Sequence, residues 1–416
     1  MTLNLIKLSC AVLTFFSCNL TSDVDPEVAQ ELTVDRFETE VEGPQKEALE
    51  VLPGAYQLEE YLPLIQDKKI ALVANQASTI GGRHLVDTLL SLKVAIQKIF
   101  SPEHGFRGDA DAGALVKDGV DLTTGLPLIS LYGKNKKPSL AQLKGIDLVV
   151  FDLQDVGVRF YTYLSSLHYV MEACAEAKIP LIILDRPNPN AHYIDGPILQ
   201  KEYNSFVGMH PVPVVYGMSI GEYGQMINGE FWLADRLQCK LKVIPIKNWN
   251  HESTYELPIA PSPNLPNQLS IYLYPSLCFF EGTSISVGRG TEIPFQCYGH
   301  PYYKDTSFSF TPMAIPGKSL DPPHENQKCF GRDLSGWPLD SVRKRAMLNL
   351  DFLIEAFAKT QEREFFTSPR FFNLLAGNKL LIEQVKAGRS ANEIRASWVE
   401  GLEQFKAIRT NYLIYP

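Results

Sequence analysis

Short apolar runs recur between residues 52 and 246, separated by longer stretches with helical spacing. Three of these runs are nearly continuous: Lys69–Ala74 (KIALVA), Asp147–Asp152 (DLVVFD) and Ile179–Asp185 (IPLIILD). Strands without polar alternation are buried on both faces, which is typical of a parallel sheet covered by helices on each side. The pattern therefore predicts an α/β fold built on an open, doubly wound, Rossmann-like parallel sheet.

Weaker signals supply the remaining elements of this sheet. Further strands are predicted at Ile96–Phe100, Pro127–Leu131, Val212–Val215 and Leu241–Ile246. Apolar residues at three- and four-residue spacing predict helices over Gly82–Leu92, Leu164–Ala177 and Ile220–Leu233. Ser219 and Glu222 have the spacing of a capping box at the start of the last of these helices.

The composition of the sequence changes near residue 260. Pro261, Pro263 and Pro266 interrupt regular structure, residues 270–300 are aromatic and β-prone, and residues 301–340 are rich in proline. Helices are predicted again over Leu339–Lys359, Asn378–Ala387 and Ala391–Ala407. We therefore expect a Rossmann-like domain over residues 51–262 and a smaller α+β auxiliary domain over residues 263–416.

The first 18 residues have the features of a signal peptide. Lys7 precedes an apolar stretch from Leu8 to Phe16, which is too short to span a bilayer as a permanent helix. The sequence before Cys18 resembles a bacterial lipoprotein cleavage site, and residues 19–50 form an acidic linker. We expect an exported protein, either a periplasmic or outer-membrane lipoprotein that touches the membrane only through a lipid on Cys18, or a secreted one.

Several function classes are disfavoured by the sequence. The net charge of −8 and the scattered basic residues argue against nucleic-acid binding. The chain contains no G-x-G-x-x-G turn after its first strand, no G-x-S-x-G elbow and no H-E-x-x-H motif. The five cysteines after Cys18 are widely spaced and include no C-x-x-C pair. We therefore expect neither a metal nor a cofactor.

Polar residues follow four of the predicted strands, and in open parallel sheets ligands bind beyond the carboxyl ends of the strands. These positions are Asn75, Ser101–Gly108, Asp152–Tyr163 and Asp185–Asn190. Any one of the segments has an ordinary explanation, since Asp and Asn cap helices and turns. Their shared placement favours a binding edge, with these candidate residues: Asn75, His104, Arg107, Arg159, Tyr161, Arg186 and Asn188.

The candidate residues at this edge favour a reaction carried out by carboxyl groups. Cleavage of a glycosidic bond generally needs one carboxyl to protonate the leaving oxygen and a second group to act as nucleophile, activate water or stabilise charge. Glu103 is a candidate general acid, because burial beside Phe106 would favour its neutral form. Asp155, on a neighbouring strand end, is the candidate second group.

Five segments resemble, in the same order, those of the NamZ-type exo-β-N-acetylmuramidases, which form glycoside hydrolase family 171. They are SPEHGFRG (Ser101–Gly108), DLQDVGVRFYTY (Asp152–Tyr163), DRPNPN (Asp185–Asn190), APSPNL (Ala260–Leu265) and EGTSISVGRGTEIP (Glu281–Pro294). The resemblance extends from about Tyr56 to Pro416. It implies an active site between two domains, hydrolysis of terminal non-reducing N-acetylmuramic acid from peptidoglycan-derived MurNAc-GlcNAc saccharides, and Glu103 as the catalytic residue.

Residues of the second domain are expected to complete this cleft: Asn264, Glu281, Arg289 and Glu292. Glu281 or Glu292 is an alternative to Asp155 as the partner carboxylate, and a polar turn at the domain interface is the plainer explanation of both. Two other functions stay open. One is a surface lipoprotein that binds muropeptides or glycans without cleaving them, and the other is a hydrolase of a different acidic sugar.

Overall fold

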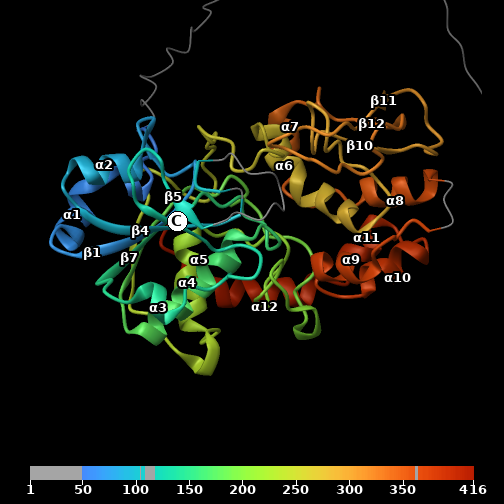
Figure 1. Ribbon diagram of the computed structural model, residues 1–416. Helices are drawn as coiled ribbons and strands as arrows, with labels where there is room; N and C mark the ends of the chain where they lie inside the picture. Colours follow the sequence, from blue (N-terminus) through green and yellow to red (C-terminus); the bar gives the residue numbers. More distant parts are fainter. Residues whose placement is uncertain (1–48, 104, 108–117, 361–363) are drawn as a thin grey trace, which may run out of the picture. The chain divides into compact units, whose positions relative to one another are not determined.

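A seven-stranded sheet organises the first half of the chain in the computed structural model, which describes residues 49–103, 105–107, 118–360 and 364–416 (Figure 1). The strand order is β5-β6-β4-β1-β7-β8-β9, and every pair is parallel except β5 with β6. The strands are β1 (Lys69–Ala74), β4 (Ala95–Ser101), β5 (Gly119–Val120), β6 (Pro127–Ser130), β7 (Leu148–Asp152), β8 (Leu181–Leu184) and β9 (Leu241–Ile244). The chain builds outward from β1 in both directions, which confirms the predicted doubly wound α/β fold.

Helices cover both faces of this sheet, as the continuous apolar strands predict. Leu148 and Val150 of β7 pack in the apolar cluster that contains side chains of α1 (Leu58–Ile65) and α2 (Leu85–Ser91). Val149 and Phe151 point to the other face, toward the cluster that contains α3 (Leu140–Leu143), α4 (Tyr163–Ala177) and α5 (Ile220–Gly229). A short hairpin, β2 (Thr79–Ile80) with β3 (Arg83–His84), follows β1.

Two local predictions have different outcomes. The capping box at α5 is confirmed, because Ser219 Oγ accepts from the backbone of Glu222 and the Glu222 carboxylate accepts from the backbone of Ser219. The strand predicted at Val212–Val215 is wrong, since Val215 makes only isolated bridges with Val158 and Asp195. These valines are apolar because they lie fully buried in the core beside the sheet, not because they belong to it.

The second half of the chain combines helices with a small antiparallel sheet of order β10-β12-β11. Its strands are β10 (Cys297–His300), β11 (Ser309–Phe310) and β12 (Cys329–Asp333). Its helices are α6 (Gln268–Leu277), α7 (Leu339–Lys344), α8 (Asp351–Lys359), α9 (Pro369–Ala376), α10 (Leu380–Lys386), α11 (Ala391–Ala396) and α12 (Val399–Arg409). The helix predicted over residues 339–359 is thus broken into α7 and α8.

Helix α6 overturns the β-prone prediction for residues 270–277, whereas β10 lies within the predicted range. All ten of its residues are buried, so its sequence has no polar face from which a helix could be read. Asn267 and Ser270 form a capping box at its start. Pro275 has no N–H to give to the carbonyl of Ile271, and Asn190 Nδ2 donates to that carbonyl instead, at 3.3 Å.

The last described residues return to the first half of the chain, where Figure 1 draws the red α12 among the green helices. Arg409 Nε donates to the carbonyl of Gly217 at 2.8 Å, and Tyr415 donates its hydroxyl to Asp185 Oδ2 at 2.6 Å. Leu49–Pro416 accordingly forms one compact unit, and the boundary between residues 262 and 263 stays a prediction.

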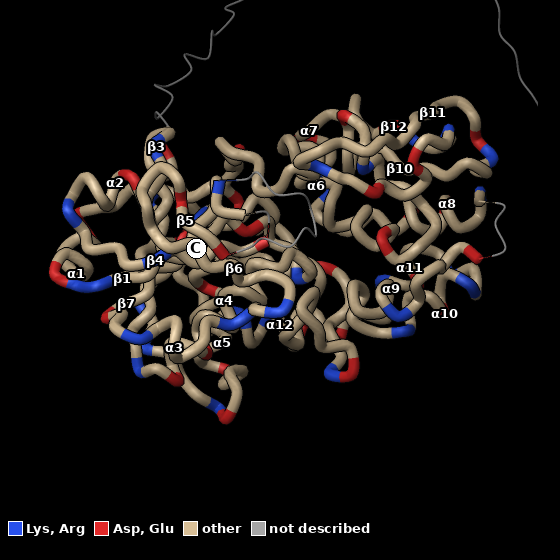
Figure 2. The backbone as a smooth tube through the Cα atoms, viewed as in Figure 1, with Lys and Arg blue, Asp and Glu red and all other residues tan. Residues whose placement is uncertain are grey.

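Lys and Arg positions are interspersed with Asp and Glu positions along the backbone of both halves of the described chain (Figure 2). Among the described residues, no helix has the length and apolar character needed to cross a membrane.

Candidate active site

A cavity of about 270 Å³ lies where the carboxyl ends of the strands meet the second half of the chain. Glu103 follows β4, Tyr132 follows β6, and residues 160–163 end the loop after β7, so the first half contributes from the ends of three strands of the sheet. The opposite wall comes from the chain after residue 260. Its polar and aromatic members are Ser262, Asn264, Tyr274, Cys278, Glu281, Arg289, Phe295 and Phe371.

Glu103 is the carboxylate that the first half presents to this cavity. Its side chain is half-buried, and Thr162 Oγ1 donates to Glu103 Oε2 at 3.0 Å. Tyr132 also hydrogen-bonds to Glu103, and burial together with that carboxylate raises the pKa of Tyr132 to about 12. Tyr132 is therefore a neutral donor at physiological pH. Two hydroxyl groups thus fix a carboxyl group that faces an open space.

Two tyrosines form the wall behind Glu103. The rings of Tyr161 and Tyr163 meet edge to face with centroids 4.8 Å apart. Tyr161 donates its hydroxyl to the carbonyl of Pro261 at 2.8 Å, which links the two halves of the chain at this wall. Asn75 Nδ2 donates to the Tyr163 hydroxyl at 2.8 Å, and burial raises the pKa of both phenols. The rings are therefore neutral and present a rigid, largely apolar surface.

The opposite wall carries an ion pair and an amide. Arg289 Nε donates to Glu281 Oε1 at 2.8 Å, Nη2 contacts the same oxygen, and the guanidinium lies 5.0 Å from the ring centre of Phe295. Asn264 Nδ2 donates to the carbonyl of Lys318 at 2.8 Å. Asn264 Oδ1 is buried and has no hydrogen-bond partner among the described residues, so it can accept a hydrogen bond from a ligand.

This arrangement combines a fixed carboxyl, an arginine, a spare amide acceptor and aromatic faces, which suits a polar ring compound with an acidic group. The part of the chain that the structure describes contains no group of three or more His, Cys, Asp or Glu side chains able to hold a metal ion.

Comparison with known proteins shows the family to which this chain belongs. Residues 70–269 match the family model described as exo-beta-N-acetylmuramidase NamZ, N-terminal, and residues 272–415 match its C-terminal counterpart. The chain belongs to the NamZ exo-β-N-acetylmuramidase family. The peptidoglycan beta-N-acetylmuramidase NamZ of Bacillus subtilis (strain 168) is 38% identical over 376 residues, which are 86% of this chain and 89% of that protein.

Two solved structures resemble most of this NamZ-family chain. Both are DUF1343 family proteins from Bacteroides fragilis NCTC 9343, and each match covers 88% of this chain and 99% of the other. One has 46% identity and a TM-score of 0.82, and the other has 27% identity and a TM-score of 0.74.

Five residues predicted from the NamZ resemblance and the strand ends line the cavity: Glu103, Tyr161, Asn264, Glu281 and Arg289. Asn75 lies directly behind it, against Tyr163. Asp155 is buried away from the cavity lining, where its Oδ2 accepts from the backbone of Gly157 at 2.7 Å and from the hydroxyl of Tyr216. Burial raises the pKa of Asp155 to about 6.

The remaining predicted residues make other contacts. Arg107 pairs with Asp121, and Arg186 forms a buried ion pair with Asp152. Arg159 is fully buried and donates to the carbonyls of Pro197, Val212 and Leu375, which ties the first half to α9. Asn188 donates to the carbonyl of Met218, and the side chain of Glu292 is 85% exposed. His104 lies outside the described residues.

Several lining residues carry no role in the sequence predictions. Tyr132 directly follows the predicted strand Pro127–Leu131, so a search of the residues after each predicted strand would have found it. Thr162 and Tyr163 lie within the motif DLQDVGVRFYTY, from which Arg159 and Tyr161 were predicted as binding residues. Tyr274 and Cys278 reach the cavity from α6 and the turn after it, and the sequence gives no sign that this segment is helical.

Proposed function

We propose that this chain is an exo-β-N-acetylmuramidase, a glycoside hydrolase that removes terminal N-acetylmuramic acid from the non-reducing end of peptidoglycan fragments. Family membership and the name of the Bacillus subtilis relative support the reaction. The observation that carries the assignment to this cavity is the Glu103 carboxyl on its wall, held by Thr162 and Tyr132.

Glu103 serves in this proposal as general acid and base. In its neutral form it gives its proton to the glycosidic oxygen while the bond from the muramic acid C1 to that oxygen breaks. The resulting carboxylate then accepts a proton as water adds, which restores the starting state. Thr162 holds Oε2, so the carboxyl is oriented before the substrate arrives.

The opposite wall recognises the sugar. Arg289 attracts the lactyl carboxylate that distinguishes N-acetylmuramic acid from N-acetylglucosamine, because guanidinium groups bind carboxylates with directed hydrogen bonds. Asn264 Oδ1 accepts from the acetamido N–H, which gives this buried acceptor the partner it lacks within the described chain. The faces of the cavity tyrosines pack against the sugar ring.

Glu103→Gln tests the assignment, since glutamine keeps the shape of the side chain but cannot donate a carboxyl proton. We expect release of free N-acetylmuramic acid from a MurNAc-β-1,4-GlcNAc disaccharide to slow by ~10²–10⁴-fold. Glu383→Gln is the matched control, because Glu383 is an exposed residue of α10 that does not line the cavity.

Each outcome of this assay has a distinct meaning. A near-normal rate for Glu103→Gln contradicts the role of Glu103 but leaves the reaction standing. If the folded parent protein binds the disaccharide and releases nothing, the chain is a saccharide-binding protein and the enzymatic proposal fails.

The proposal extends to location. We propose that the protein is exported and anchored by a lipid on Cys18, with the acidic residues 19–50 as a tether. The signal-like composition of the first 18 residues supports this. Cys18 lies outside the described residues.

A further inference from the structure

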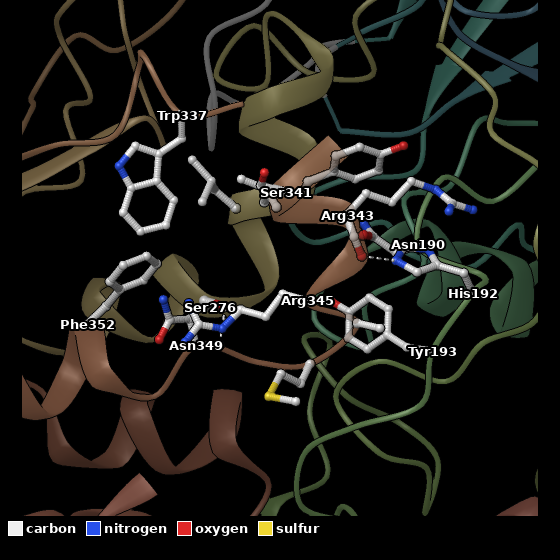
Figure 3. Close-up of a pocket in the computed structure, with 15 residues that line it drawn as sticks. Asn190, His192, Tyr193, Ser276, Trp337, Ser341, Arg343, Arg345, Asn349 and Phe352 are labelled. Carbon is white, nitrogen blue, oxygen red and sulfur yellow. Dashed lines mark hydrogen bonds between the residues drawn. The ribbon is translucent and has the colours of Figure 1, made fainter. Parts of the chain in front are cut away.

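A second cavity, of about 210 Å³, borders a different face of α6 from the cavity that contains Glu103. Figure 3 draws the residues that line it. Tyr272 and Ser276 line it, whereas Tyr274 and Cys278 line the cavity that contains Glu103. Residues four apart share a face of a helix, and residues two apart lie on nearly opposite faces. The two cavities share no lining residue, so the second is a separate site.

Aromatic rings form one wall of this second cavity. Figure 3 shows Trp337 and Phe352 together at one side, and their ring centres are 5.6 Å apart. Trp337 is 39% exposed although it is among the largest apolar side chains, and Met347 nearby along the same lining segment is also exposed. A partly exposed indole face beside a cavity is a surface on which a sugar ring can pack.

Two arginines give the cavity an excess of positive charge. Arg343 donates to the backbone carbonyl of Glu252 at 2.6 Å and has no carboxylate partner in the described ranges. Arg345 extends across the cavity in Figure 3. Its ion pair with Asp351 is 3.5 Å long and solvent-exposed, so it is weak and a ligand carboxylate can compete for the guanidinium.

A buried amide oxygen also points to a ligand. Asn349 lines the cavity with only 7% of its surface exposed, and its Oδ1 has no hydrogen-bond partner within the residues that the structure describes. Its backbone N–H is used, since it donates to Ser276 Oγ at 2.8 Å. A ligand N–H or O–H would give this buried acceptor the partner that it lacks among the described residues.

The cavity continues into a neighbouring space of about 380 Å³. The two spaces share four lining residues, Trp337, Arg345, Asn349 and Phe352, so they form one groove with these side chains at its centre. The neighbouring space adds Arg332, Asp333, Asp351 and Glu355, so the excess of positive charge lies in the first cavity and not along the whole groove.

We propose that this groove, called here the Trp337 groove, is a second saccharide-binding site that takes an acidic amino sugar. The sugar ring packs on Trp337, its carboxylate binds Arg345, and its acetamido N–H donates to Asn349 Oδ1. The choice of N-acetylmuramic acid as the probe rests on the proposed function, whereas the site itself rests on the groove. Such a site would hold a glycan strand on the enzyme between cleavage events.

Tryptophan fluorescence tests this inference directly. The parent protein and Trp337→Phe are titrated with N-acetylmuramic acid, and the difference between them isolates the signal of Trp337. We expect a saturable difference signal, and at least tenfold weaker binding of N-acetylglucosamine, which lacks the carboxylate. Arg345→Met, which keeps Trp337, should lose the saturable signal, while Arg389→Met, at an exposed arginine outside both cavities, should titrate like the parent.

Two results would overturn the proposal: no Trp337-dependent signal with either sugar, or an unchanged titration in Arg345→Met. Disaccharide hydrolysis is measured on the same preparations, and Arg345→Met should retain the parent rate because α6 separates it from Glu103. A parent protein that hydrolyses nothing but gives the Trp337 signal refutes the proposed function alone. Normal hydrolysis without that signal refutes the second site alone.

Discussion

Replacing Tyr415 with phenylalanine removes one buried oxygen without opening a cavity of note, yet it should destabilise the protein strongly. The hydroxyl donates to Asp185 Oδ2 at 2.6 Å and accepts from the backbone N–H of Ile246 at 2.8 Å. Burial raises the pKa of Asp185 to about 7, so its carboxyl is only partly ionised at neutral pH. An ordinary hydrogen bond contributes ~0.5–1.5 kcal/mol and an unpaired buried N–H costs ~1–3 kcal/mol, so the expected loss in the free energy of unfolding is ~2–4 kcal/mol.

Tyr412→Phe is the matched control for this change. Tyr412 donates its hydroxyl to Glu230 at 2.6 Å in a half-buried position, and solvent can replace that contact, so we expect a loss of ~1 kcal/mol or less. Urea unfolding of both variants beside the parent, followed by fluorescence, gives the difference from the shift in midpoint. A loss for Tyr415→Phe no larger than that for Tyr412→Phe would refute the reasoning that the buried hydroxyl secures the chain end.

Three further predictions concern the site, its pH dependence and the N-terminus. Thr162→Val should lower kcat about tenfold with KM little changed, because it removes one hydrogen bond that orients Glu103, whereas Thr162→Ser should restore the rate. Burial raises the pKa of Asp155 from 3.8 to about 6, so the native state holds this proton more tightly than the unfolded chain. The buried Asp155 carboxyl therefore contributes fully to the free energy of unfolding below about pH 4, and up to ~3 kcal/mol of this contribution is lost as the pH rises to 6. In Asp155→Asn, the urea midpoint should fall less between pH 4.5 and pH 7 than it does in the parent protein. Cys18→Ala should move the protein from the membrane fraction to the soluble fraction of its host, and an unchanged distribution would contradict lipid anchoring.

The sheet could be predicted from the sequence because its strands are buried on both faces. Lys69–Ala74 is identical in the prediction and in the structure, and the strand at Leu148–Asp152 differs by one residue. The same rule fails for α6, because a helix buried on all sides shows no 3.6-residue period, and its tyrosines and proline suggest other structure. Burial erases the pattern on which the prediction depends.

The site was only partly predictable, because polar residues at strand ends serve two purposes. Glu103 reaches the cavity, but Arg186 forms an ion pair with Asp152 at the end of β7. Arg159 donates hydrogen bonds to three backbone carbonyls in the core. A sequence shows that an arginine follows a strand but not which partner it meets. The opposite wall depends on the packing of α6 and the turn around Arg289, which local sequence does not specify.

Because residues 409–415 return to the sheet, the fold of the first half is completed only at the end of synthesis. Asp185 already accepts from Ser219 and Gly221, but the backbone N–H of Ile246 meets the Tyr415 hydroxyl only when Tyr415 has been made, more than 160 residues later. That buried amide therefore lacks its final partner while the whole second half of the chain is synthesised. A ribosome that stalls late, or a protease that trims the last residues, would leave a nearly complete chain whose first half is less stable, because it lacks the hydrogen bonds of Tyr415.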